Sequence, residues 1–154
     1  TRFKYAARTR ALLMLAAIFA PSFVAAEQIV ERASSSEIIV QVSLSSQTMK
    51  VYQSGVARHE WPVSTARVGK VTPKGSWTAK WLSKNHKSSR YNNAPMPYSI
   101  FYNGNFAVHG TDQVDRLGSP ASAGCIRLHP QNAAVLFALV DAVGLKNTTI
   151  SVIN

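Results

Sequence analysis

The sequence contains a single cysteine, Cys125, within the segment Ser122-Ala-Gly-Cys-Ile-Arg127. His109 lies 16 residues upstream, at the expected end of a strand. A thiol with a pKa near 8.5 is a poor nucleophile until a neighbouring base, such as an imidazole, takes its proton. The spacing therefore allows a nucleophile–base pair. The alternatives are a small buried cysteine and a histidine packed beneath a sheet, since free cysteine is often buried.

Small residues flank Cys125, so a substrate could approach its sulfur. The backbone N–H groups of Ala123, Gly124 and Cys125 could converge in a tight turn. Converging donors stabilise the oxyanion that forms when a carbonyl is attacked, each lowering the barrier by roughly 3 kcal/mol. One cysteine also excludes an intramolecular disulfide framework and a metal site built mainly from thiolates. The other histidines lack ligand spacing with His109, so we expect no metal site.

The segments around these residues alternate between apolar and polar residues as β-strands do. We expect an antiparallel meander over residues 38–44, 48–52 and 56–63. Further strands are expected at 76–82, at 148–153 and in a hairpin of 98–102 with 106–109, whose turn is Asn103-Gly104. Loops are expected at 69–75, 83–93 and 112–123 because these segments are polar or rich in Gly and Pro.

One helix is expected after the cysteine segment. Pro130 suits the first position of a helix, and Gly144 suits its C-terminal cap. Between them an apolar stripe repeats at helical spacing, which predicts one face packed against the sheets. The stripe consists of Val135, Leu136, Leu139, Val140 and Val143.

The first 26 residues of the 154-residue chain carry four basic residues and no acidic ones. An apolar run at 11–20 and the small residues Val24-Ala-Ala26 follow, a pattern typical of a secretory signal. The alternative is an uncut membrane anchor, although the run is about half of the ~20 residues that a spanning helix needs. We expect a signal peptide at 1–26, a short leader at 27–37 and one domain at 38–154.

The positive charge of the chain points to an anionic partner. The whole chain has 17 Lys+Arg and 7 Asp+Glu, a formal charge of +10, and residues 27–154 keep +6. The basic residues are scattered rather than arranged in a stripe, so nucleic acid is not the expected partner. An anionic cell-envelope polymer is the expectation, and a merely soluble basic surface is the alternative.

These motifs resemble the L,D-transpeptidases, the YkuD-type family. The resemblance rests on His109-Gly-Thr111, Leu117-Gly-x-Pro120 and Ser122-x-Gly-Cys-Ile-Arg127, and with upstream segments it covers about 38–153. Many members have His between that Ser and Gly, where this chain has Ala123. This departure removes a second imidazole from the expected pocket.

The resemblance implies a mostly β, sandwich-like catalytic domain with one main helix packed on it. Cys125 would be the nucleophile and His109 the base, with the carbonyl of Gly110 orienting the imidazole ring. Ala123 and Gly124 would supply oxyanion donors. The residues expected to bind substrate or brace the cysteine loop are Arg127, Ser122, Tyr98 and Met96.

The implied substrate is a tetrapeptide stem of peptidoglycan. Cys125 would attack the carbonyl of its third residue, release D-Ala, and pass the thioester to an amine of a second stem, a 3→3 cross-link, or to an envelope protein. No metal or organic cofactor is needed, and we expect an exported monomer of the periplasm or cell envelope that acts in cell wall biogenesis and cell shape. The alternatives are hydrolysis of the same thioester, as in an L,D-carboxypeptidase or an amidase that releases wall-attached protein, and a non-enzymatic envelope-binding domain.

Overall fold

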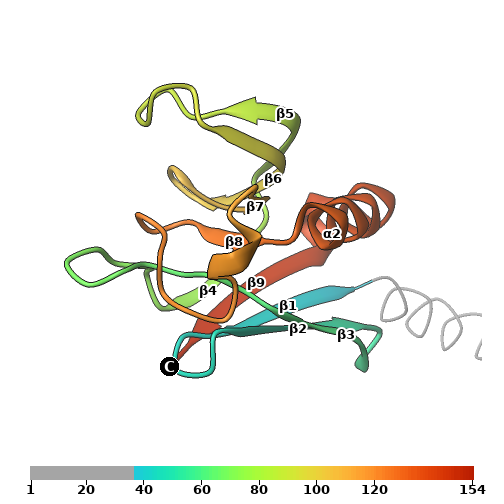
Figure 1. The fold of residues 1–154 in the computed structure, drawn as a ribbon. Coiled ribbons are helices and arrows are strands. Elements are labelled where there is room, and N and C mark those ends of the chain that lie inside the picture. The colour runs from blue at the N-terminus through green and yellow to red at the C-terminus, as the bar shows by residue number, and fades with distance from the viewer. Residues whose placement is uncertain (1–36) are drawn as a thin grey trace, which may run out of the picture.

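Two β-sheets and one α-helix make up residues 37–154, which are the residues that the computed structural model describes (Figure 1). The expected signal peptide and residues 27–36 of the leader lie outside the described residues. The five-stranded sheet has the order β3-β2-β1-β9-β4, and the four-stranded sheet has the order β5-β6-β7-β8. The elements are β1 (Ile38–Ser43), β2 (Thr48–Gln53), β3 (Val56–Pro62), β4 (Gly75–Thr78), β5 (Trp81–Lys87), β6 (Pro95–Asn103), β7 (Phe106–Gly110), the 3₁₀ turn η1 (Val114–Arg116), β8 (Ile126–Leu128), α2 (Pro130–Val143), the 3₁₀ turn η2 (Leu145–Asn147) and β9 (Thr148–Ile153).

The expected meander is confirmed, because β1, β2 and β3 pair in antiparallel register. The last strand, β9, lies beside β1 in parallel register and also pairs with β4. A parallel neighbour needs a long connection, and here almost the whole chain lies between the two strands. Strand β9 therefore places the C-terminal end of the described chain beside its N-terminal strand, within the five-stranded sheet.

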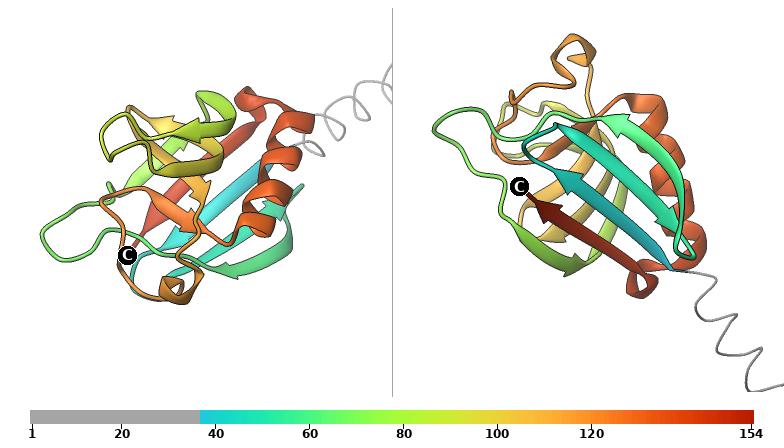
Figure 2. Two further views of the ribbon diagram at one scale, coloured as in Figure 1. Left: turned by 45° about the horizontal axis from the view of Figure 1, so that its top comes forward. Right: turned by 90° about the horizontal axis from the view of Figure 1, so that it is seen from below.

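The core lies between the two sheets and α2, so the expected sandwich-like fold is confirmed (Figures 1 and 2). Alternate side chains of each strand point into this core, as the pleat of a β-strand requires. Its fully buried members include Val40, Val42, Met49, Val51, Ile100, Tyr102, Ile126, Leu128, Leu136, Val140 and Ile150. The opposite face of the four-stranded sheet is thereby left for other side chains.

Helix α2 begins at Pro130 and is capped by Gly144, as the sequence predicts. The Gly144 N–H donates to the carbonyl of Val140 at 2.8 Å, and its φ of 87° suits glycine. The expected apolar stripe is partly wrong, because Val135 is 43% exposed. Leu136 and Val140 of the stripe are buried together with Ala133, and Leu139 and Val143 pack, partly buried, against the core, so Val135 alone departs from the expected stripe.

Two sequence expectations in the middle of the chain are wrong. The expected strand at 76–82 is two strands, and these belong to different sheets, with β4 next to β9 and β5 next to β6. The expected loop at 83–93 is strand as far as Lys87. Its polar residues fit a strand at the edge of a sheet, where the long strand β6 supplies the hydrogen-bonding partners on one side only.

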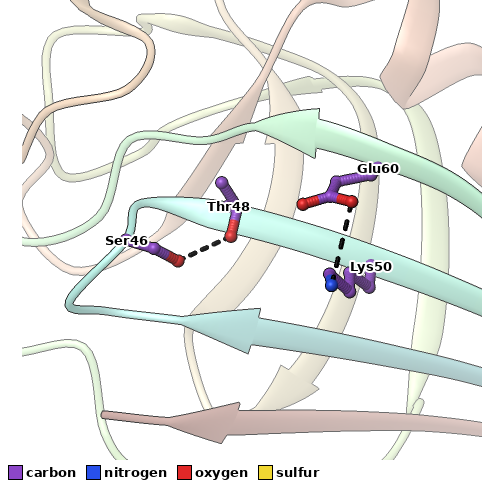
Figure 3. Close-up of polar contacts among 4 residues, drawn as sticks. All are labelled: Ser46, Thr48, Lys50 and Glu60. Atoms are coloured by element: carbon purple, nitrogen blue, oxygen red, sulfur yellow. Dashed lines mark hydrogen bonds and ion pairs between the residues drawn. The ribbon is translucent and has the colours of Figure 1, made fainter.

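The solvent face of the five-stranded sheet is polar (Figure 3). Lys50 of β2 pairs with Glu60 of β3 at 3.8 Å between Nζ and Oε2, and the two residues are opposite in the strand register. Ser46 and Thr48 share a hydrogen bond of 2.6 Å between their hydroxyl oxygens. An exposed ion pair of this kind contributes at most about 1 kcal/mol. This face is therefore a solvated, polar surface.

Candidate active site

Cys125 and His109 lie at neighbouring strands of the four-stranded sheet. His109 is in β7 and is opposite Arg127 of β8 in the parallel pairing, and Cys125 comes directly before β8. Cys125 packs against a small cluster of Met96, Phe101 and Ala107, which is separate from the main core. Because side chains alternate along a strand, Ala107 and His109 share the face opposite to that of the buried Val108. The topology therefore brings the thiol and the imidazole to one face.

The imidazole of His109 is buried, with 5% of the residue exposed. Its Nδ1 lies 2.7 Å from the carbonyl oxygen of Gly110. A carbonyl only accepts, so Nδ1–H donates this bond and Nε2 carries the free lone pair. Burial lowers the pKa of His109 to about 4, the Gly110 bond opposes this, and the electrostatic effects of Arg127 and His86 add to the lowering. The ring is therefore a neutral base at neutral pH.

The sulfur of Cys125 is partly exposed, and its hydrogen bond goes to the carbonyl of Asn105 at 3.8 Å. Within residues 37–154, no hydrogen bond joins this sulfur to the His109 ring. Burial raises the pKa of the thiol, while the backbone N–H of Ala107 and the charge of Arg127 lower it. The resting site therefore holds a neutral thiol, and such catalytic contacts often tighten only when substrate binds.

The loop before Cys125 is shaped by Ser122, which is buried. Its hydroxyl accepts a hydrogen bond from the Gly124 N–H at 3.0 Å, so this expected oxyanion donor is engaged. The Ser122 N–H donates to Thr65 at 2.8 Å. In the described part of the chain, the N–H groups of Ala123 and Cys125 donate to no acceptor. These two groups are thus the ones free to bind an oxyanion, and Ser122 is a loop-bracing residue.

A second loop, between β3 and β4, holds the cysteine loop from outside. The Thr72 hydroxyl donates to the Gly124 carbonyl at 2.8 Å and accepts from the Ala66 N–H at 3.0 Å. Gly124 has a φ of +140°, and a Cβ there would lie 2.7 Å from the ring of Phe106 and 2.9 Å from the carbonyl oxygen of Val71. The position next to the sulfur therefore requires glycine.

Arg127 contacts the site through both its backbone and its side chain. Its N–H and carbonyl pair with Ser64 at 2.9 and 3.1 Å, which joins β8 to the segment after β3. Its guanidinium Nη1 donates to Oε1 of Gln113 at 3.0 Å. The side chain of Arg127 therefore contacts the Gln113 amide of the 112–121 segment, while its backbone joins β8 to the segment after β3.

The two remaining expected site residues, Met96 and Tyr98, lie in different surroundings. Met96 lies in the cluster that contacts Cys125. Tyr98 has a φ of +57° and packs edge-on against Phe137 of α2, with ring centroids 5.8 Å apart. Tyr98 is therefore directed to the helix side of the sheet, and Met96 to the side of the thiol.

Sequence reasoning missed the aromatic group next to this cluster. Trp81 stacks on Phe101 with ring centroids 3.9 Å apart, and His86 meets the Phe101 ring edge-on at 4.9 Å. The sequence predicts a loop at 83–93, whereas His86 lies in β5 opposite Met96. Trp81 is the residue that could have revealed this strand, because it pairs with Phe101 and so fixes the register of β5 against β6.

Residues 37–152 match the family model described as YkuD, the L,D-transpeptidase catalytic domain. The chain belongs to this family. The match covers the whole described domain except its last two residues and confirms the resemblance found in the sequence. The expected fold class is confirmed as well, because solved structures of L,D-transpeptidases are similar in fold over three quarters of the chain.

Three relatives illustrate the similarity to other YkuD-type proteins. A Bacillus licheniformis protein named as a candidate L,D-transpeptidase, YkuD, is 23% identical over 105 residues, which are 66% of this chain and 59% of that protein. The L,D-transpeptidase LdtMt1 in complex with imipenem has a TM-score of 0.67 at 27% identity, over 75% of this chain and 58% of that one. An L,D-transpeptidase of Stackebrandtia nassauensis has a TM-score of 0.67 at 26% identity, over 77% and 56%. The chain thus spans less than two thirds of the length of these YkuD-type relatives.

Among residues 37–154, no three His, Cys, Asp or Glu side chains gather as a metal site would need. In the same residues, no helix has the length and apolar character to cross a membrane.

Proposed function

We propose that this chain is a peptidoglycan L,D-transpeptidase that works through a thioester on Cys125. The observation that carries the proposal is a partly exposed thiol on the same sheet face as a buried imidazole whose Nδ1 is held by the Gly110 carbonyl. This arrangement leaves Nε2 of His109 free to take a proton, and it stands in a domain of the YkuD family. No residue in this scheme needs a metal or an organic cofactor.

Acylation would begin as Sγ of Cys125 attacks the carbonyl carbon of the third residue of a tetrapeptide stem. Nε2 of His109 takes the thiol proton at the same time, because both groups are neutral beforehand. The oxygen of the carbonyl becomes an oxyanion, which the free N–H groups of Ala123 and Cys125 can stabilise. The C–N bond then breaks, the proton passes from His109 to the departing amine, and D-Ala leaves.

Deacylation would use the same groups in reverse. An amine of a second stem attacks the thioester carbon, His109 accepts the amine proton, and the proton returns to sulfur as the C–S bond breaks. The product is a 3→3 cross-link. An envelope protein that offers an amine would be attached by the same step.

We also propose an exported monomer of the periplasm or cell envelope that contributes to cell wall biogenesis and cell shape. The net charge of +6 over residues 27–154 supports an anionic wall as its surroundings. Two alternatives to a transpeptidase differ in what happens to the stem peptide. Water as acceptor would make a carboxypeptidase or a releasing amidase, and absence of turnover would leave a binding domain.

The proposal is tested by mass spectrometry of isolated muropeptides after incubation with the purified chain. We expect dimers joined by a 3→3 bond and free D-Ala, and neither with Cys125→Ala. Tripeptides without dimers would replace the transferase by a hydrolase. Unchanged muropeptides with folded protein would contradict both and favour the binding domain.

A further inference from the structure

Two arginines flank the cysteine loop from different segments of the chain. Arg127 is two residues after the nucleophile and opposite His109 in the β7–β8 pair. Arg67 reaches the loop from the other side, since its N–H donates to the carbonyl of Ser122 at 3.0 Å. Arg67 lies in the long connection of residues 63–74 between β3 and β4, and Figure 2 shows this connection extending away from both sheets. The backbones of the two arginines therefore meet at one loop.

The positive charges of Arg67 and Arg127 also interact with one another. Burial is the main reason why the pKa of Arg127 is lowered, and the charge of Arg67 lowers it further, while Cys125 and Asp112 act in the opposite direction. Like charges repel one another, so an anion that binds both groups would relieve the repulsion and gain charge-assisted hydrogen bonds. The charge of Arg127 also acts on both His109 and Cys125.

Neither arginine has a carboxylate partner within the described residues. The ion pair found there is Lys50 with Glu60, on the opposite side of the fold. Residues 61–111 contain seven Lys and Arg and no Asp or Glu. The guanidinium of Arg127 is instead held by the neutral amide of Gln113, which fixes its direction without neutralising its charge. The site is therefore prepared for an anion from outside.

The proposed reaction brings such an anion close to the sulfur. In a tetrapeptide the leaving D-Ala ends in a carboxylate, and three bonds separate its carboxylate carbon from the carbonyl carbon that Cys125 attacks. Standard bond lengths put these two carbons within about 4 Å. Guanidinium groups bind carboxylates through paired, charge-assisted hydrogen bonds.

We infer that Arg67 and Arg127 together bind the terminal carboxylate of the residue that leaves, an inference that rests on the proposed function. Arg127 is the fixed member, because it is half-buried and held by Gln113. Arg67 is the exposed member and closes on the carboxylate from the β3–β4 loop. The site selects donors with a free carboxylate directly after the scissile bond and disfavours those extended or amidated there.

The test compares two tetrapeptide donors that differ only at the C-terminus, one a free acid and the other a carboxamide. Binding is measured by calorimetry in the Cys125→Ala background, where no acylation can occur. We expect the acid to bind about 10- to 100-fold more tightly than the amide, the range that a lost charge-assisted hydrogen bond gives. Adding Arg67→Gln or Arg127→Gln should weaken binding of the acid and leave binding of the amide unchanged.

Matched controls separate this inference from the function on which it rests. Arg58→Gln, on the exposed edge strand β3, should keep the full preference, and Arg67→Lys should keep part of it. Equal affinity for acid and amide, or a preference that survives both Gln variants, would overturn the carboxylate site even if the wild type forms the thioester. A clear preference without acylation of the wild type would support the site and contradict the proposed function. Circular dichroism of each variant verifies its fold, and Arg67 is exposed enough to be replaced without disturbing the core.

Discussion

The thiol of Cys125 and the imidazole of His109 are both set to be neutral at rest. Burial raises the pKa of the first and lowers that of the second to about 4. Burial disfavours the charged form of each group, and therefore disfavours a thiolate–imidazolium pair at rest. The proton should therefore move from sulfur to imidazole only as the carbonyl is attacked. The Gly110 carbonyl supports this by keeping the proton of the neutral ring on Nδ1.

We therefore predict how alkylation of Cys125 depends on pH. The rate with iodoacetamide should be low at neutral pH and should rise through and above the ordinary thiol range near pH 8.5, because only the thiolate reacts. The rate is measured by mass spectrometry from pH 5 to 10, with denatured chain as the reference thiol. A plateau already reached near pH 6 would indicate a preformed ion pair and contradict this description.

At the scale of elements, two loops position the nucleophile. The segment after β3 pairs with Arg127 through Ser64 and bonds Gly124 through Thr72. The buried side chain of Gln47 holds this segment in turn, since its amide bonds both the hydroxyl and the N–H of Thr65. The cysteine loop is thus fixed by contacts from distant parts of the sequence.

Gly124→Ala should disrupt this arrangement. The added Cβ would meet Phe106 and Val71 at under 3 Å, and φ of +140° is unfavourable for alanine. We expect a loss of stability of about 1–3 kcal/mol in urea unfolding and at least a tenfold slower acylation. Gly104→Ala is the matched control, because Gly104 also has a positive φ but a Cβ added there would meet no other atom. Equal acylation rates for both variants would show that the cysteine loop tolerates the change.

The local parts of this fold could be predicted from the sequence, and the non-local parts could not. The caps of α2, the hairpin of β6 and β7 and the two chemical residues each depend on short motifs. Strand β5 was missed because its polar residues resemble a loop until β6 is known to pair with it. Arg67 and Gln113 were missed because their contacts with the site join segments that are far apart in the sequence.

At the scale of the whole molecule, burial of His109 couples the site to the stability of the fold. The folded pKa of about 4 lies below the unfolded value near 6.5, so the unfolded chain binds more protons between these values. Stability should therefore fall as the pH decreases from 6.5 towards 4, by roughly 3 kcal/mol from this residue alone. The contribution is fully present above pH 6.5.

Urea unfolding at a series of pH values between 4 and 7 measures this loss. His109→Gln, which does not titrate, should lose less stability over the same range than the wild type. The same pH dependence in both proteins would mean that other groups dominate and that His109 is not held neutral by its burial.

The central claim, a thioester on Cys125, is tested most directly by the mass of the intact chain. The chain is mixed with a tetrapeptide donor, quenched in acid within seconds and analysed by mass spectrometry with peptide mapping. We predict an added mass equal to the donor minus D-Ala, located on the peptide that contains Cys125. His109→Gln should form it about 10²–10⁴-fold more slowly, and Cys125→Ala should not form it at all. An adduct on Cys125→Ala, or no adduct on folded wild-type chain, would contradict the account.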